Sequence, residues 1–131
     1  MKKLFVSLPM KGRSDEEIKA SILKMKSVAE AFEGCELELI DSFVEEDATE
    51  GVHPGIWYLG ESIKRLSQAD VYIGIEDDWP WNGCYIENET ANRYNIKRYL
   101  VRATDIIEDY EQLCERVFRR PTDDPVKVTL F

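Results

Sequence analysis

Short apolar segments alternate with longer helical segments along the chain, and this alternation constrains the fold more than any other feature. The apolar segments span residues 3–8, 35–40, 70–75 and 96–101, and each has the length and residue pattern of a β-strand. The connections between them are too long for hairpins, so the strands are expected to run parallel. The sequence therefore predicts an α/β fold in which helices cover both faces of a central parallel sheet of four or five strands.

The helical segments are expected at residues 14–34, 56–69, 84–95 and 104–118. The first is the best defined, because Ser14 and Glu17 have the spacing of a capping box and Gly34 follows the last turn. Thr104 is the expected cap of the last helix. The remaining tail, 119–131, either adds a fifth strand or docks elsewhere.

Length and charge limit the classes of protein to which the chain can belong. Its 131 residues favour a single domain over 1–131. The net charge of −9 argues against nucleic-acid polymers and anionic membranes as partners, since both require basic surface. A small anionic ligand remains possible, because a few local donors can hold one.

Cysteine and histidine usage favours a reducing compartment and no structural zinc. The cysteines Cys35, Cys84 and Cys114 are scattered and odd in number, which is unlike a disulfide framework. The chain has one histidine, so a zinc site is not expected, and no cofactor is predicted. The apolar run at the start is too short for a signal peptide or a membrane span. We therefore expect a cytoplasmic protein.

The loop after the first strand is the first place to search for a ligand site, because open parallel sheets bind ligands beyond the carboxyl ends of their strands. This loop reads "SLPMKGRSDEE" and leads into the capped helix, whose free amides and dipole favour an anion. Its candidate anion ligands are Lys11, Gly12, Arg13 and Ser14. An ordinary exposed loop with two basic residues explains the same pattern, and both readings stay open.

The segment 84–95 carries two glutamates that helical geometry separates. The residues expected on its buried side are Ile86, Thr90, Ala91 and Tyr94. At about 100° per residue Glu87 falls among them and faces the sheet. Glu89 falls outside this arc and is expected to pair with Arg93 at the surface. Glu87 is thus either a carboxylate in the ligand crevice or simply an acid in the first turn that interacts with the helix dipole.

The loop before this segment contains aromatic and acidic residues at the ligand edge. Trp79 and Trp81 could stack on a planar base or anchor a subunit interface. The acids at strand ends are Asp41, Glu76, Asp77 and Asp78, a set that could hold Mg²⁺ as in a phosphorelay receiver. A receiver needs a further acidic cluster directly after the first strand, and the stretch "SLPM" there offers none.

The stretches "LFVSLPMKGRSDEE", "ADVYIGI" and "GCYIENETANRY" resemble the nucleoside 2-deoxyribosyltransferase family, including its nucleoside 5′-monophosphate N-glycosidase relatives. The resemblance runs from residue 3 to about residue 101 and is most like small bacterial and phage members. It implies a flavodoxin-like three-layer sandwich. The family motif has a glycine four residues before its catalytic glutamate and an alanine four after, which correspond here to Gly83, Glu87 and Ala91.

The resemblance implies that Glu87 is the nucleophile in cleavage or transfer at the N-glycosidic bond of a nucleoside or nucleoside 5′-monophosphate. It also implies that the first loop receives the 5′-phosphate and that Asp77 or Asp78 contacts the base. The substrate-binding residues expected from the residues and the resemblance together are Phe5, Pro9, Lys11, Gly12, Arg13, Ser14, Ser62, Trp79, Trp81 and Gly83. The expected active form is a homo-oligomer in which a neighbour's C-terminal part completes the pocket.

Three departures from the family pattern favour an alternative. The family has a tyrosine at Phe5, a carboxylate at Ser62, and often a glycine at Glu89. Loss of that hydroxyl and that carboxylate would weaken or abolish catalysis. The alternative is a catalytically inactive nucleotide-binding or sensing domain of the same fold.

Overall fold

The computed structural model describes residues 1–41, 46–117 and 125–130. Its sheet contains β1 (Lys3–Val6), β2 (Glu38–Leu39), β3 (Val71–Ile75) and β4 (Lys97–Val101). The strand order is β2-β1-β3-β4 and every pair is parallel. This confirms the predicted parallel sheet, and its doubly wound order is consistent with a flavodoxin-like fold.

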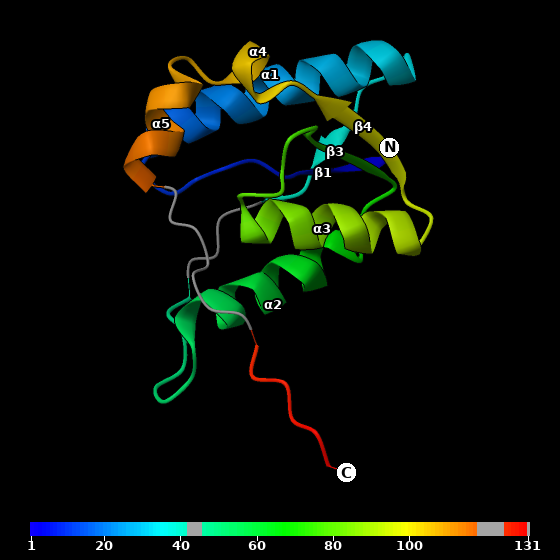
Figure 1. Cartoon of the computed structure of the whole chain (residues 1–131). Coiled ribbons are helices and arrows are strands. Elements are labelled where there is room, and N and C mark those ends of the chain that lie inside the picture. Colours follow the sequence, from blue (N-terminus) through cyan, green and yellow to red (C-terminus); the bar gives the residue numbers. More distant parts are fainter. Residues whose placement is uncertain (42–45, 118–124, 131) are drawn as a thin grey trace.

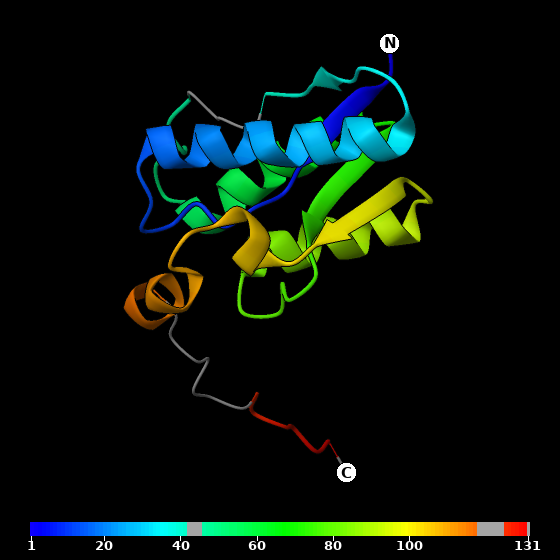
Figure 2. The same ribbon diagram turned by 90° about the horizontal axis from the view of Figure 1, so that it is seen from above.

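Helices cover both faces of the sheet, which makes three layers (Figures 1 and 2). One face carries α1 (Asp15–Glu33), α4 (Ala103–Ile106) and α5 (Tyr110–Val117). The other carries α2 (Pro54–Leu66) and α3 (Asn82–Arg93), which lie side by side. The predicted α/β sandwich is confirmed.

The strands supply both cores because successive side chains point to opposite faces. Leu4 and Val6 of β1 belong to the larger cluster, which packs against α1, α4 and α5. Phe5 lies between them in sequence and belongs to the smaller cluster beneath α2 and α3. That smaller cluster consists of Phe5, Ile40, Leu66, Tyr72 and Ala91, with Ile63, Ala69 and Ile96 packed against it.

The caps of α1 confirm the prediction for this helix. The Ser14 side chain accepts a hydrogen bond from the backbone N–H of Glu17 at 3.2 Å, and the Glu17 carboxylate accepts from the N–H of Ser14 at 3.4 Å. Gly34 follows the helix in the left-handed region with φ 76°, where glycine carries no steric penalty.

The prediction of one helix over 104–118 is wrong. The segment forms α4 and α5, separated by Asp109 at φ 53°. Ile106 and Ile107 are both buried in the larger core, and these adjacent side chains reach it because the chain leaves helical geometry after Ile106. The residue that caps α4 is Arg102, so the expectation for Thr104 is also wrong.

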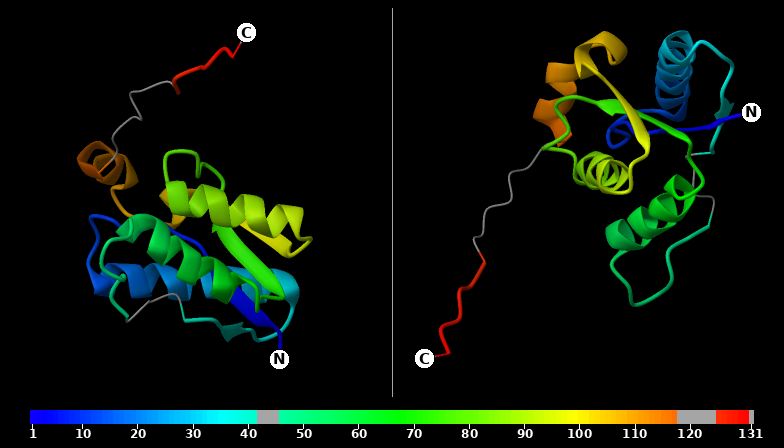
Figure 3. Two further views of the ribbon diagram at one scale, coloured as in Figure 1. Left: turned by 90° about the horizontal axis from the view of Figure 1, so that it is seen from below. Right: turned by 90° about the vertical axis from the view of Figure 1, so that its right-hand side faces the viewer.

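The described part of the tail, 125–130, forms no strand and extends away from the sandwich (Figure 3). The rest of the predicted tail segment, 119–124 and 131, lies outside the described residues. Within the described part of the chain, none of the helices has both the length and the apolar character needed to cross a membrane.

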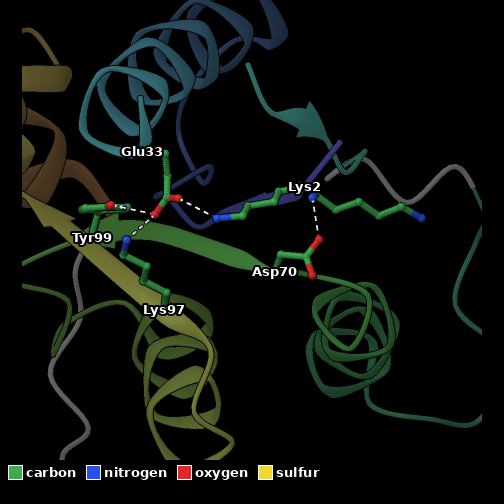
Figure 4. Close-up of polar contacts among 6 residues, drawn as sticks. Lys2, Glu33, Asp70, Lys97 and Tyr99 are labelled. Atoms are coloured by element: carbon green, nitrogen blue, oxygen red, sulfur yellow. Dashed lines mark hydrogen bonds and ion pairs between the residues drawn. The ribbon is translucent and has the colours of Figure 1, made fainter. Parts of the chain in front are cut away.

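A cluster of charged residues ties α1 to the sheet at the edge where the strands begin (Figure 4). Glu33, in the last turn of α1, accepts hydrogen bonds from Lys2 Nζ at 3.1 Å and Tyr99 Oη at 2.7 Å and forms an ion pair with Lys97 Nζ at 2.6 Å. These partners, Lys97 first, lower the pKa of Glu33 to about 2. The cluster joins α1, β4 and the chain start at the end of the sheet opposite to the ligand edge.

Candidate active site

A pocket of about 400 Å³ opens beyond the carboxyl end of β1. The loop after β1, one side of α2 and the first turns of α3 form its walls. Its lining residues are Phe5, Val6, Ser7, Leu8, Pro9, Met10, Lys11, Gly55, Tyr58, Leu59, Ser62, Trp81, Asn82, Gly83, Cys84 and Glu87. This is the edge at which open parallel sheets bind ligands, and the volume falls within the ordinary range for small-molecule sites.

Glu87 lies in this pocket with only 9% of its surface exposed. Ser7 Oγ donates a hydrogen bond to Oε1 at 2.7 Å, and Ser62 Oγ donates a short one to Oε2. Burial raises the pKa of Glu87, while the two hydroxyl groups act in the opposite direction. Both carboxylate oxygens are therefore held in place by donors from two different elements.

The helical spacing of α3 explains why Glu87 faces inward. The buried residues of this helix are Cys84, Glu87 and Ala91, at positions i, i+3 and i+7. The prediction that Ile86 and Tyr94 face the sheet is wrong, because these side chains are 39% and 78% exposed. The buried side of the helix is centred on Glu87 and Ala91 instead. The predicted surface pair is confirmed, since Arg93 Nε lies 2.8 Å from Glu89 Oε1.

Ser7 is a site residue that the sequence interpretation missed. It follows β1 on the same side of the sheet as Phe5, and its backbone N–H donates to the carbonyl of Ile73 at 2.9 Å. The sheet thereby fixes the hydroxyl that holds Glu87. A small polar residue directly continuing a buried apolar strand, two positions after an inward-facing Phe5, was the available signal.

Cys84 lies one turn before Glu87 and is also buried in the pocket wall. Burial, and next the charge of Glu87, raise the pKa of its thiol to about 12. The thiol therefore stays protonated at neutral pH, where it is a poor nucleophile. Of the two groups, Glu87 is the one suited to attack an electrophilic carbon.

The predicted anion loop divides into residues that line the pocket and residues that do not. Pro9 and Lys11 line it. Arg13 turns back toward α1, where it donates to Ser21 Oγ at 2.6 Å and to the carbonyl of Pro9 at 3.1 Å. Ser14 is engaged in the cap of α1. Lys11 is thus the cation of this loop that lies at the pocket.

Gly12 lies outside the pocket lining and packs against α5. It has φ +80°, and a Cβ at this position would lie 2.5 Å from Val117 Cγ1. Its carbonyl accepts a hydrogen bond from Arg116 at 3.4 Å. Helix α5 therefore supports the outer side of the loop, which keeps the inner side toward the pocket.

The two tryptophans of the β3–α3 loop lie in different surroundings. Trp81 lines the pocket and donates from Nε1 to Tyr110 Oη at 2.7 Å. Trp79 is 72% exposed and stands edge-on to Tyr85 at a centroid distance of 5.0 Å. The stacking and interface interpretations of Trp79 and Trp81 both remain predictions.

Asp77 and Asp78, expected near the base, are not among the lining residues. Asp77 is exposed. Asp78 is buried, and it accepts from Asn88 Nδ2 at 2.9 Å through its side chain and from the N–H of Trp81 at 2.8 Å through its carbonyl. These bonds shape the loop. Among the described residues, no group of three or more His, Cys, Asp or Glu side chains could hold a metal ion.

The fold and the site define an α/β protein with a pocket at the carboxyl edge of its sheet and a buried carboxylate in that pocket. No family model, no curated protein and no solved structure matches the chain. The resemblance noted from the sequence therefore stays a prediction, and the geometry of the pocket is the observation from which a function is argued.

Proposed function

We propose that this chain cleaves or transfers at the N-glycosidic bond of a nucleoside or nucleoside 5′-monophosphate, with Glu87 as the nucleophile. The observation that carries this proposal is the carboxylate of Glu87, buried in a pocket of about 400 Å³ with a serine hydroxyl on each oxygen. A fixed carboxylate beside an enclosed sugar is the arrangement that glycosyl transfer requires.

The reaction proceeds in two displacements at C1′ of the sugar. One oxygen of Glu87 forms a bond to C1′ as the C1′–N bond breaks, and the base departs with the bonding electrons and takes up a proton from water. The transition state has oxocarbenium character, which a nearby carboxylate stabilises. Water or a second base then attacks C1′, releases the carboxylate and loses a proton to the solvent, which gives hydrolysis or transfer respectively.

The proposed substrate contacts are chosen from the residues that line the pocket. Lys11 is a cation of the pocket lining and is the proposed contact for a 5′-phosphate, whereas Arg13 is turned toward α1. The aromatic residues Tyr58 and Trp81 offer apolar surface to a planar base, whereas Phe5 is 1% exposed and belongs to the core behind the pocket wall. Gly83, in the first turn of α3, also lines the pocket.

The second candidate is a catalytically inactive nucleotide-binding or sensing domain. Phe5 and Ser62 favour it, because they line the pocket at positions where the resemblance expects a tyrosine hydroxyl and a carboxylate. Such a protein would bind the same ligands in the same pocket and leave the glycosidic bond intact.

A substrate panel separates the two candidates. Deoxynucleosides and their 5′-monophosphates are incubated with the protein, and free base is measured by chromatography. We expect release that is lost in Glu87→Gln and kept in the matched control Glu89→Gln, which alters a carboxylate of the same helix paired at the surface. A ligand-dependent rise in Tm without release would support the sensing domain. No release and no change in Tm with any ligand would contradict both.

The expected compartment is also part of the proposal. Cys35, Cys84 and Cys114 are free thiols, of which Cys35 is exposed. Free thiols and nucleotide substrates are both characteristic of the cytoplasm. We therefore place the proposed activity there.

A further inference from the structure

The indole of Trp81 connects the pocket to α5. Trp81 lines the pocket, and its Nε1 donates a hydrogen bond to Tyr110 Oη at 2.7 Å. The two ring centroids lie 6.4 Å apart with the ring planes at 45°, and both side chains pack against the larger core. Since the N–H is the only hydrogen-bonding group of an indole, this bond satisfies it completely.

The backbone of Trp81 is fixed independently of this bond. Its N–H donates to the carbonyl of Asp78 at 2.8 Å, and its carbonyl accepts from the N–H of Tyr85 at 2.9 Å, at the start of α3. These bonds leave the rotation of the side chain about χ1 and χ2 open. A hydrogen bond at the far end of the ring selects one orientation among the staggered rotamers. Tyr110 therefore determines how the indole stands in the pocket wall.

The Tyr110 hydroxyl is itself held by an anchored helix. Tyr110 is the first residue of α5, in which Leu113 is 3% exposed and belongs to the larger core. Val117 of the same helix lies so close to Gly12 that an added Cβ there would come within 2.5 Å of it. Helix α5 thus contacts both loops, after β1 and after β3, that contribute residues to the pocket lining. Rigid support of this kind preorganises a binding site.

We propose that Tyr110 is a positioning residue that holds Trp81 in the orientation in which its ring is presented to the planar base of the ligand. The effect on base binding rests on the proposed function, whereas the order of the indole does not. The two tryptophans of the β3–α3 loop then have different roles, since Trp79 is 72% exposed and its ring lies against Tyr85.

Binding and turnover in the full chain test this role. Tyr110→Phe keeps the aromatic ring and removes the acceptor, so the indole N–H loses its partner. KM for the common deoxynucleoside 5′-monophosphates, or Kd where a nucleotide is bound without cleavage, should rise about fivefold, the effect of one hydrogen bond between neutral groups. The kcat should change less than twofold, because Ser7 and Ser62 still hold Glu87. Binding of 2-deoxyribose 5-phosphate, which has no base, should be unchanged.

A double-mutant cycle shows whether the effect passes through Trp81. In the Trp81→Phe background, Tyr110→Phe should have no further effect on KM, since a phenyl ring has no N–H to donate. Tyr85→Phe is the matched control, because it removes the hydroxyl of a tyrosine that contacts Trp79 and should leave KM unchanged. The same KM in the wild type and Tyr110→Phe, or an equal rise in both backgrounds, would overturn the inference even with base release established.

The order of the indole is measured without any ligand. In ¹H–¹⁵N spectra the indole N–H of Trp81 is assigned by its loss in Trp81→Phe, and its exchange with water should be about fivefold faster in Tyr110→Phe. An unchanged exchange rate would also overturn the inference. If the wild type neither binds nor cleaves any nucleotide, the proposed function fails, while this exchange rate still decides whether Tyr110 holds the ring.

Discussion

Glu87 is a carboxyl group whose burial works against its charge. Its folded pKa is raised, so folding favours the neutral form. The contribution of this group to stability is therefore fully present below about pH 4.5, its ordinary pKa, and is lost as the pH rises through the folded value. If the ionised carboxylate serves in chemistry, the protein is less stable at neutral pH than it would be with a neutral group at this position.

Glu87→Gln should accordingly stabilise the protein at pH 8. An effect on the order of 1 kcal/mol would raise Tm by about 4 °C. The gain should disappear below about pH 4.5, where the glutamate is itself neutral. Calorimetry across this pH range measures the difference, with Glu89→Gln as the control at a surface position. A lower Tm for Glu87→Gln at pH 8 would contradict this account of the carboxyl.

At the scale of elements, the loop after β1 depends on a glycine that α5 covers. Gly12→Ala would place a Cβ 2.5 Å from Val117 Cγ1 and force a left-handed φ of +80° on an alanine. We expect a loss of about 1–3 kcal/mol in the free energy of unfolding. Urea denaturation measures it.

Gly60→Ala is the matched control for this substitution. Gly60 lies inside α2, and a Cβ there would meet nothing within 4 Å. Alanine should stabilise this helix by about 1 kcal/mol. If both alanines had the same sign of effect, the contact between α5 and the loop would not be what makes Gly12 necessary.

The cluster around Glu33 predicts how the attachment of α1 to the sheet responds to acid. The folded pKa of Glu33 is lowered to about 2, so its contribution to stability is present above about pH 4.5 and is lost as the pH falls through about 2. Glu33→Gln should be less stable than the wild type at pH 7, and the two unfolding curves should converge near pH 2. Glu36→Gln, at an exposed position just beyond the helix, is the control. A difference that persists unchanged at pH 2 would exclude the ion pairs as its cause.

Features encoded by neighbouring residues could be predicted from the sequence, and features that depend on strand register could not. The cap of α1 is a four-residue pattern, and Glu87 lies at a spacing that a helix fixes. Ser7 reaches Glu87 only when β1 pairs in parallel with β3, the strand that precedes α3. The partner of Arg13 could not be predicted either. A cation that precedes a helix can bind an anionic ligand or hydrogen-bond to the helix, and Arg13 does the latter through Ser21.

At the scale of the whole molecule, several large apolar side chains of the single chain are exposed to solvent. Ile56 and Trp79 are 67% and 72% exposed, and the tail residues Val126, Val128 and Leu130 are 89%, 74% and 74% exposed. Contact with a second copy of the chain would remove this apolar surface from water. We therefore retain the proposal of a homo-oligomer.

Light scattering coupled to size exclusion tests this proposal. We expect a mass that is a multiple of 15.2 kDa, with a shift toward the single-chain mass in the double variant Trp79→Ser and Val128→Lys. The substitution Thr129→Lys adds the same charge to the tail without removing an apolar side chain, and it serves as the control. A single-chain mass for the wild type at every concentration would contradict self-association.

The central claim is that Glu87 forms a covalent bond to the sugar, and trapping that bond is its most direct test. A 2-deoxy-2-fluoro nucleoside or its 5′-monophosphate slows both displacements and lets the glycosyl ester accumulate. Intact-mass spectrometry should then show one added glycosyl group, and peptide mapping should place it on Glu87. Base release without any adduct, or an adduct on another residue, would contradict the claim.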